Sequence, residues 1–232
     1  MKVALLGDIH GNSDALNAVL VAAKKEGAVK TLITGDLVGY YSDAPKVLEL
    51  LIDWDWTSVG GNHEGMLSDW CAGVNQNDIL FRYGSAIRST FENLTSEQVD
   101  LLVNLPSSSS LNVLGKKVLL CHGSPWDRDV YVYPDASEGI RDRFSEGEFD
   151  LVVFGHTHYP TRWVCGETLV VNPGSVGQPR DRKPGACWVL WDSGENTVEF
   201  RREEYDMGRL IAQIKKSDPQ LPYLWKVLTR TT

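Results

Sequence analysis

Five short segments of the sequence place side chains that can bind metal ions or transfer protons directly after a run of apolar residues. The segments are GDIHGN, GDLVGY, GGNHEG, CHGSP and GHTHYP, which begin at residues 7, 35, 60, 121 and 155. A single histidine near a strand end is more often a capping or core residue than a ligand. Histidines placed only for packing would not all gather in such segments, so the pattern predicts a metal site. The side chains concerned are those of Asp8, Asp36 and Asn62 and all five histidines of the chain: His10, His63, His122, His156 and His158.

The donor atoms indicate which metals such a site would hold. They are nitrogen and oxygen without sulfur, which suits manganese, iron, cobalt, nickel or zinc and differs from a structural zinc site built of cysteines. There are more donors than one ion uses. We therefore expect two divalent transition-metal ions that share one carboxylate, with manganese preferred. Two ions about 3.5 to 4 Å apart are the usual device for displacement at phosphorus, because they polarise a phosphoryl oxygen and generate a nucleophilic water.

Hydrophobic periodicity predicts a βαβαβ arrangement over the first sixty residues. This order implies parallel strands joined by right-handed crossovers. The carboxyl ends of parallel strands lie at one edge of a sheet, where ligands gather, so the polar segments are expected to meet there. The expected elements are a strand at 2–6, a helix at 13–26, a strand at 30–34, a helix at 43–53 and a strand at 56–60.

The rest of the chain is predicted to be helical at first and then richer in antiparallel strands. The serine-rich stretch at 106–110 is typical of a loop, and we find no linker that would divide the single domain expected over 1–232. The helices over about 64–104 and the loop at 124–136 are expected to form the walls of the site. Trp126, in that loop, is a candidate for substrate contact. The predicted elements are helices over about 64–104, a hairpin around Gly115, a helix at 137–145, a strand that begins at 150, hairpins at 161–171 and 186–200, and a helix at 207–216.

Composition and charge narrow the class of protein. The chain has 42% hydrophobic and 23% charged residues, enough apolar material for a globular core. Its formal net charge of −8 makes non-specific binding to nucleic acid unexpected, and an anionic substrate would need local positive charge. No apolar run approaches the roughly 20 residues of a membrane span, and the start lacks a signal-peptide pattern. The four cysteines are widely spaced, so we expect a cytoplasmic protein with reduced thiols.

The polar segments follow one another in the order D-x-H, G-D, G-N-H-E, H and G-H-x-H, from Asp8 to His158. In this order the chain resembles the calcineurin-like metallophosphoesterases. It is most similar to a small bacterial and archaeal branch that includes phosphodiesterases and dinucleoside tetraphosphate hydrolases. The resemblance implies an α/β fold, a four-layer α/β/β/α sandwich with two mixed sheets packed face to face. To this we add a helical insert at about 64–104 and a C-terminal helical tail at about 205–232.

The resemblance also implies a role for each ligand. Asp36 would bridge the two ions, a bridging hydroxide would attack phosphorus in line, and His63 would act as general acid or steady the transition state. The expected substrate is a small phosphorylated molecule, with a nucleotide as one candidate; a membrane is not an expected partner, and the oligomeric state is left open. The first ion would be held by Asp8, His10 and His158, and the second by Asn62, His122 and His156.

The chain departs from the protein-phosphatase branch of that family at two positions. There an aspartate orients the catalytic histidine and an arginine binds phosphate, whereas this sequence has Gly39 and Tyr40. Arg180 is our candidate for replacing some of that charge, although a solvated loop arginine is an equal alternative. Glu64 could orient His63 or cap the following helix, and the capping role is favoured.

The leading expectation is hydrolysis of phosphodiesters or dinucleoside polyphosphates. The alternative within enzymes is a phosphomonoesterase, including a protein phosphatase of loose specificity. A non-catalytic metal-binding scaffold ranks lower, because every ligand of the family pattern is retained.

Overall fold

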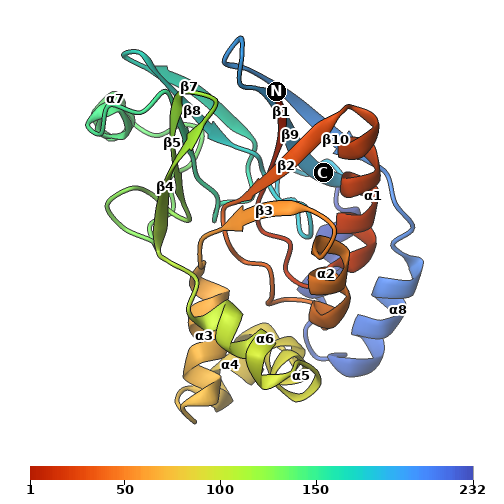
Figure 1. Ribbon diagram of the computed structural model, residues 1–232. Helices are drawn as coiled ribbons and strands as arrows, with labels where there is room; N and C mark the ends of the chain where they lie inside the picture. Colours follow the sequence, from red (N-terminus) through yellow and green to blue (C-terminus); the bar gives the residue numbers. More distant parts are fainter. Residues whose placement is uncertain (232) are drawn as a thin grey trace.

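The computed structural model describes residues 1–231 and contains two five-stranded sheets (Figure 1). Sheet A has the order β10-β9-β1-β2-β3, in which β1, β2 and β3 are parallel and β9 runs antiparallel to both of its neighbours, β1 and β10. The βαβαβ prediction is therefore confirmed. The strands of sheet A are β1 (Lys2–Leu6), β2 (Ala28–Ile33), β3 (Asp55–Ser58), β9 (Ala186–Asp192) and β10 (Thr197–Glu203).

Two helices connect the parallel strands of sheet A. Helix α1 (Ser13–Lys25) begins after Asn12, whose side-chain oxygen accepts the Ala15 N–H at 3.2 Å and so caps the helix. Helix α2 (Ala44–Leu51) has proline in its first turn, where the missing N–H costs nothing. Both helices bury apolar side chains in the cluster that covers the outer face of sheet A.

Sheet B has the order β4-β5-β6-β8-β7 and is also mixed, with β5, β6 and β8 parallel. The predicted hairpins around Gly115 and at 161–171 are confirmed as β4–β5 and β7–β8. The loop predicted at 106–110 is partly wrong, because β4 already begins at Ser108. Serines are tolerated there because β4 is an edge strand with one free side. The strands are β4 (Ser108–Val113), β5 (Lys116–Cys121), β6 (Leu151–Val153), β7 (Thr161–Cys165) and β8 (Thr168–Asn172).

The two sheets pack face to face and helices cover their outer faces, as predicted (Figure 1). Helices α1 and α2 cover sheet A, whereas sheet B is covered more thinly by α7 (Glu138–Asp142), the short 3-10 helix η1 (Arg143–Ser145) and the loop before them. Phe144 of η1 packs on Phe154 with ring centroids 5.0 Å apart. The apolar layer between the sheets includes Val3, Leu5, Leu32, Val118, Leu120, Val153 and Val171, all buried.

Four helices occupy the chain between β3 and β4 and lie at one end of the sheets (Figure 1). The predicted capping box is present, since the Thr95 hydroxyl accepts the Gln98 N–H and the Gln98 side chain accepts the Thr95 N–H. The single-domain assignment stays a prediction. The helices are α3 (Asn62–Cys71), α4 (Gln76–Tyr83), α5 (Ala86–Asn93) and α6 (Ser96–Val103).

The C-terminal segment folds back onto the loop that follows β2. It contains α8 (Gly208–Ser217), α9 (Tyr223–Lys226) and the 3-10 helix η2 (Val227–Thr229). Their apolar side chains form a cluster around Tyr41, and the Tyr41 hydroxyl donates to the Leu224 carbonyl at 3.1 Å. None of the helices described between residues 1 and 231 combines the length and apolar character needed to cross a bilayer.

Candidate metal centre

The loops that follow β1, β2, β5 and β6 bring the predicted ligands to one edge of the two sheets. Two groups of buried side chains each present ligand atoms that lie within 4.8 Å of one another. Asn62, at the start of α3, joins the second group, since its Oδ1 lies 3.0 Å from His122 Nε2. The first group is Asp8, His10, Asp36 and His158, and the second is Asp36, His122 and His156.

Asp36 lies between the two groups. Its Oδ2 is 3.7 Å from His10 Nε2 and 3.5 Å from His122 Nε2, whereas its Oδ1 accepts the backbone N–H of His63 at 2.9 Å. One carboxylate oxygen is therefore oriented by the backbone, and the other faces both groups. This geometry is what a ligand shared by two ions requires.

In the first group, two histidines direct unprotonated nitrogens at each other. His10 Nδ1 lies 3.3 Å from the Val38 carbonyl and His158 Nδ1 lies 2.6 Å from the Gln178 carbonyl. Because a carbonyl only accepts, these nitrogens carry the protons. The two Nε2 lone pairs then face each other across 3.0 Å, an arrangement that a cation between them would stabilise.

The second group repeats this arrangement. His122 Nδ1 donates to the Thr34 carbonyl at 2.7 Å, and His156 Nε2 donates to the Asp129 carbonyl at 3.1 Å. His122 Nε2 and His156 Nδ1 are left 3.0 Å apart. Burial lowers the pKa of His156 to about 4, so a proton is a poor bridge between the two rings at neutral pH. Histidine ligands of metals commonly donate their other N–H to a carbonyl, so both groups fit divalent ions.

The backbone of the candidate ligands is strained in a way that ordinary packing does not require. Five of them have the left-handed conformation, with φ between 52° and 69°. For a residue other than glycine this costs on the order of 1 kcal/mol. Backbone hydrogen bonds stabilise this conformation: the His10 N–H donates to the Asp36 carbonyl at 2.8 Å, and the Asp8 N–H donates to the Gly35 carbonyl at 3.2 Å. The five are Asp8, His10, Asp36, His156 and His158.

Without bound metal, burial disfavours the charged forms of the ionisable side chains in this site. Burial, with the nearby carboxylates of Glu64 and Asp8, raises the pKa of Asp36 well above its usual value. Burial also lowers the pKa of His10 well below its usual value, and the charges of neighbouring histidines add to this effect. Bound cations would stabilise the carboxylates in their charged form and the imidazoles in their neutral form, the two forms that bind metal.

Glu64 stabilises the loop that carries Asp36. Its carboxylate accepts N–H groups from Gly61 at 2.7 Å, Asp36 at 2.9 Å, Leu37 at 2.8 Å and Val38 at 3.3 Å. The predicted cap at the start of α3 is thus confirmed, and the same carboxylate also holds the β2 loop. The sequence does not indicate this second role, because nothing in the spacing shows that the β2 loop passes over the first turn of α3.

His63 is buried beside the first group, and its ring lies 4.7 Å from that of His10. Its Nδ1 has no hydrogen-bond partner among residues 1–231. Gly39 lies beside this nitrogen and has no side chain that could accept or donate a hydrogen bond. A side chain there would overlap the rings of His63 and His10, and the backbone φ of 141° also favours glycine. Burial lowers the pKa of His63 well below its usual value, so the ring is neutral near pH 7.

Arg180 faces the site and is not a solvated loop arginine. Its Nη2 donates to the Tyr40 hydroxyl at 3.0 Å and to Gln178 Oε1 at 3.4 Å. The Tyr40 ring lies beside both this guanidinium and the metal centre, 5.9 Å from the guanidinium carbon, 4.6 Å from the His10 ring and 4.7 Å from the His63 ring. The positive charge of Arg180 contributes to the lowered pKa of His158, after burial. Contact of Arg180 with substrate stays a prediction.

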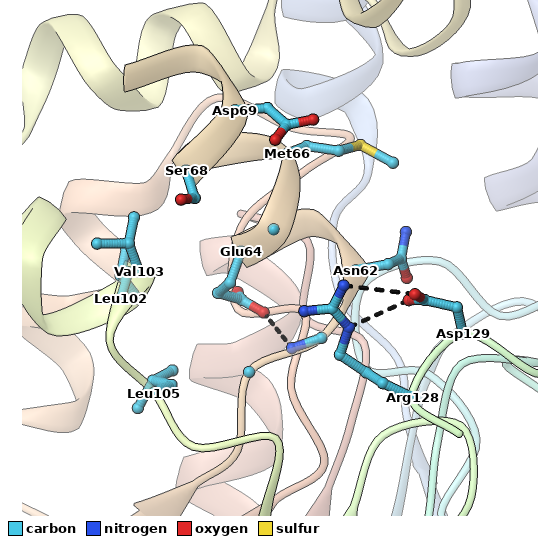
Figure 2. A pocket seen from close by; sticks show the side chains of 13 residues that line it. Asn62, Glu64, Met66, Ser68, Asp69, Leu102, Val103, Leu105, Arg128 and Asp129 are labelled. Carbon is cyan, nitrogen blue, oxygen red and sulfur yellow. Dashed lines mark hydrogen bonds and ion pairs between the residues drawn. The ribbon is translucent and has the colours of Figure 1, made fainter. Parts of the chain in front are cut away.

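A groove adjoins the second group at Asn62 (Figure 2). Its volume is about 490 Å³, and its walls come from α3, α6 and the loop after β5, in agreement with the predicted walls. Figure 2 shows Arg128 and Asp129 side by side near Asn62, and Arg128 Nε lies 3.1 Å from Asp129 Oδ1. The groove leaves room beside the metal centre for part of a substrate.

Trp126 is not among the residues that line this groove, so the groove gives no support to its predicted contact with substrate. Its ring packs on Phe144 at 5.0 Å, on the outer face of sheet B, with the Arg143 guanidinium 3.8 Å above it. The turn before it explains the direction, because Ser124 Oγ accepts the Asp127 N–H at 2.9 Å and closes the loop over the apolar cluster.

Sequence reasoning missed the tyrosine that does reach the centre from this loop. The Tyr131 ring lies 3.9 Å from the His156 ring, at an angle of 30°. The available signal was the alternation YVY at 131–133, which buries Val132 and leaves both tyrosines exposed.

Comparison with known proteins agrees with this geometry. Residues 1–194 match the model of the calcineurin-like phosphoesterase superfamily domain. The chain is 34% identical to an uncharacterized protein of Methanocaldococcus jannaschii, over 93% of this chain and 92% of that protein. It is 23% identical to phosphodiesterase YfcE of Escherichia coli, over 82% of this chain and 87% of the relative. The crystal structure of a metallophosphoesterase from Sphaerobacter thermophilus superimposes with a TM-score of 0.79 at 26% identity, covering 100% of this chain and 99% of that one.

Proposed function

Because the chain belongs to the calcineurin-like phosphoesterase superfamily and is therefore a phosphoric ester hydrolase, we propose that it hydrolyses phosphodiesters or dinucleoside polyphosphates with two divalent metal ions. The observation that carries the proposal is the place of Asp36, whose one free carboxylate oxygen faces both ligand groups. A structural site for one ion would have no use for a carboxylate in that position.

The residues of the two groups would hold the ions, with Asp36 shared between them and manganese as the first choice of metal. When bound, the ions polarise phosphoryl oxygens and lower the pKa of coordinated water. The backbone N–H of His156 donates to both oxygens of Asp8 at 3.2 Å, which keeps this carboxylate turned toward the first ion. Asp8, His10 and His158 would bind the first ion, and Asn62, His122 and His156 the second.

His63 would act on the leaving group. The ring is neutral near neutral pH, so it is suited to donating an N–H to the departing oxygen as negative charge develops there. Within residues 1–231, its Nδ1 has no partner that would favour a positive charge on the ring. This supports a substrate whose leaving group needs little protonation, such as a nucleotide or an aryl alcohol.

Arg180 would supply the local positive charge that an anionic substrate needs on a protein of net charge −8. The hydrogen bonds to Tyr40 and Gln178 both come from Nη2, so Nη1 and Nε of this guanidinium are the groups that would bind a phosphoryl oxygen.

The relative from Escherichia coli is named a phosphodiesterase, and the groove beside Asn62 can accept a second ester group. A diester places a group on each side of phosphorus, whereas a monoester would leave this space unused. These two observations favour a diesterase.

We also propose a reducing compartment, the cytoplasm, as the place of action. All four cysteines are free, and three of them, Cys121, Cys165 and Cys187, are buried. Mass spectrometry of protein alkylated directly in lysed cells would test this, since any disulfide found there would contradict it.

The function is tested with purified protein loaded with Mn²⁺ and two chromogenic substrates, bis-p-nitrophenyl phosphate and p-nitrophenyl phosphate. We expect both to be hydrolysed, the diester with the higher kcat/KM, and we expect a chelator to abolish both activities. Higher efficiency on the monoester would replace the diesterase by a phosphomonoesterase. Hydrolysis of neither, with bound metal shown by elemental analysis, would overturn the catalytic proposal and favour a scaffold.

A further inference from the structure

Three tyrosines lie outside Tyr40 and the ligands, near the metal centre. They come from elements far apart in the sequence: Tyr83 ends α4, Tyr131 lies in the loop after β5, and Tyr223 begins α9. Tyr131 is 49% exposed and Tyr223 is 40% exposed, whereas Tyr83 is half-buried. We call Tyr83, Tyr131 and Tyr223 the tyrosine rim.

The rim reaches the centre at two different ends. The Tyr83 ring lies 5.4 Å from the His63 ring, beside the first ligand group. The Tyr131 ring lies 3.9 Å from the His156 ring, in the second group. Phosphorus at the centre would therefore have one aromatic ring near its leaving group and another near the group that stays.

Tyr223 extends the rim on the side of Tyr83. Its ring centroid is 6.4 Å from that of Tyr40, and the Tyr40 ring is 6.0 Å from that of Tyr83. The Tyr223 hydroxyl donates to the Arg82 carbonyl at 2.6 Å and so ties the C-terminal segment to α4. We call the surface around the metal centre, formed by α4, the loop after β5, Arg180 and the C-terminal segment, the mouth of the site. The family match ends at residue 194, so the side of the mouth formed by Tyr223 comes from a segment beyond the matched domain.

Packing alone does not account for these exposed rings. Tyr131 rests on His156 on one side, and Tyr133 lies nearly parallel to it at 6.0 Å and 13°. A ring fixed in this way presents aromatic surface at low entropic cost, as binding sites for planar groups do. Stacking on such rings tolerates different bases, because every base has a π face.

We propose that the tyrosine rim selects substrates whose ester groups carry planar aromatic rings, with a nucleobase as the physiological class. Tyr131 contacts the group that stays on phosphorus, and Tyr83 with Tyr223 contacts the leaving group. The inference rests on the proposed function, since it names the substrate class of that site.

The test compares two diesters that release the same p-nitrophenol, thymidine 5′-(p-nitrophenyl phosphate) and methyl p-nitrophenyl phosphate. Only the group that stays differs between them. We expect the wild-type enzyme to prefer the thymidine ester by about tenfold or more in kcat/KM, within the range expected for stacking of one base. Tyr131→Leu should remove most of this preference.

Tyr83→Leu and Tyr223→Leu should lower kcat/KM for both diesters alike, because both carry the same aromatic leaving group. The matched control is Phe81→Leu, which removes another exposed ring of α4, and it should leave both values unchanged. An unchanged preference in Tyr131→Leu, or equal efficiency on both diesters in the wild type, would overturn the inference while leaving the proposed function intact.

If neither diester is hydrolysed, a binding measurement separates the selectivity of the tyrosine rim from the proposed catalytic activity. Calorimetry of the metal-loaded protein with thymidine 5′-phosphate and with methyl phosphate reports on the rim directly. Tighter binding of the nucleotide that Tyr131→Leu reduces about tenfold would support the rim although the catalytic proposal had failed. Equal binding of both phosphates would overturn the inference.

Discussion

The metal centre and the mouth around it are built in different ways. At the centre, most candidate ligands leave the ends of strands on short loops, and five of them have a strained left-handed backbone fixed by hydrogen bonds. The mouth is made by α4, the loop after β5, Arg180 and the C-terminal segment, and its rings contact one another without such strain. The centre thus fixes individual atoms, whereas the mouth presents surfaces.

Substitutions should be more severe at the metal centre than at the mouth. At the centre, replacing a single donor atom removes a metal ligand, and no neighbouring side chain can take its position. At the mouth, a lost side chain removes part of a surface, and neighbouring groups remain. Changes at the centre should therefore abolish activity, whereas changes at the mouth should alter affinity and selectivity.

The largest effect is expected for Asp36→Asn. An amide is a poorer bridge than a carboxylate, and this residue faces both groups, so metal and activity should be lost together. Elemental analysis after dialysis should find about one ion or fewer per chain, and hydrolysis of bis-p-nitrophenyl phosphate should fall to background. Two tightly held ions in this variant would show that Asp36 is not shared.

His63→Ala should separate catalysis from metal binding within the centre. We expect metal content to stay at the wild-type value and kcat to fall by about 10²- to 10⁴-fold, the usual contribution of a group that assists proton transfer. The decrease should be smaller for a diester whose leaving alcohol is more acidic. If metal content fell as it does in Asp36→Asn, His63 would be a ligand and its assigned role would be wrong.

Arg180→Gln should behave as a residue of the mouth. Loss of a charge-assisted contact to phosphate should lower kcat/KM by about tenfold to a hundredfold, chiefly through KM, with metal content unchanged. Arg182→Gln is the matched control, because Arg182 is an exposed arginine of the same loop. Equal effects of the two substitutions would show that Arg180 acts only through the general charge of the loop.

Trp126→Leu is expected to have the smallest effect on activity. This ring packs on the outer face of sheet B, so the substitution should lower the free energy of unfolding by about 1 to 3 kcal/mol and leave kcat/KM within about twofold of wild type. Urea denaturation and the diester assay measure the two quantities. A large increase in KM at unchanged stability would restore Trp126 as a substrate contact.

The same difference explains how much of the molecule the sequence predicts. Chelating side chains are uncommon, and their spacing after apolar strands marks the edge of the sheet, so the convergence of the two ligand groups is predictable. The parallel first half follows from the alternation of strands and helices, and the antiparallel strands of the second half follow from hairpin signals. The packing of two sheets face to face is what the family resemblance implies. Strand ends differ by up to about three residues, because pairing extends or shortens a strand at positions that propensity leaves open.

What the sequence does not show depends on contacts between distant segments. The direction of Trp126 depends on a turn at Ser124, and the contact of Tyr131 with His156 depends on where that turn sends the chain. Glu64 reads as a helix cap in the sequence, but its hold on the β2 loop requires that loop to lie over α3. Aromatic residues are common in cores, so tyrosines alone do not indicate the mouth of a site.

The need for two metal ions is tested by the rate of bis-p-nitrophenyl phosphate hydrolysis measured against the number of Mn²⁺ ions bound per chain. Metal-free protein would be titrated with Mn²⁺, with bound metal and rate determined on the same samples. We expect the rate to rise mainly as the second ion binds, and we expect Asp36→Asn to show no such rise. Full activity with a single bound ion, or two bound ions without hydrolysis, would contradict catalysis by two ions that share Asp36.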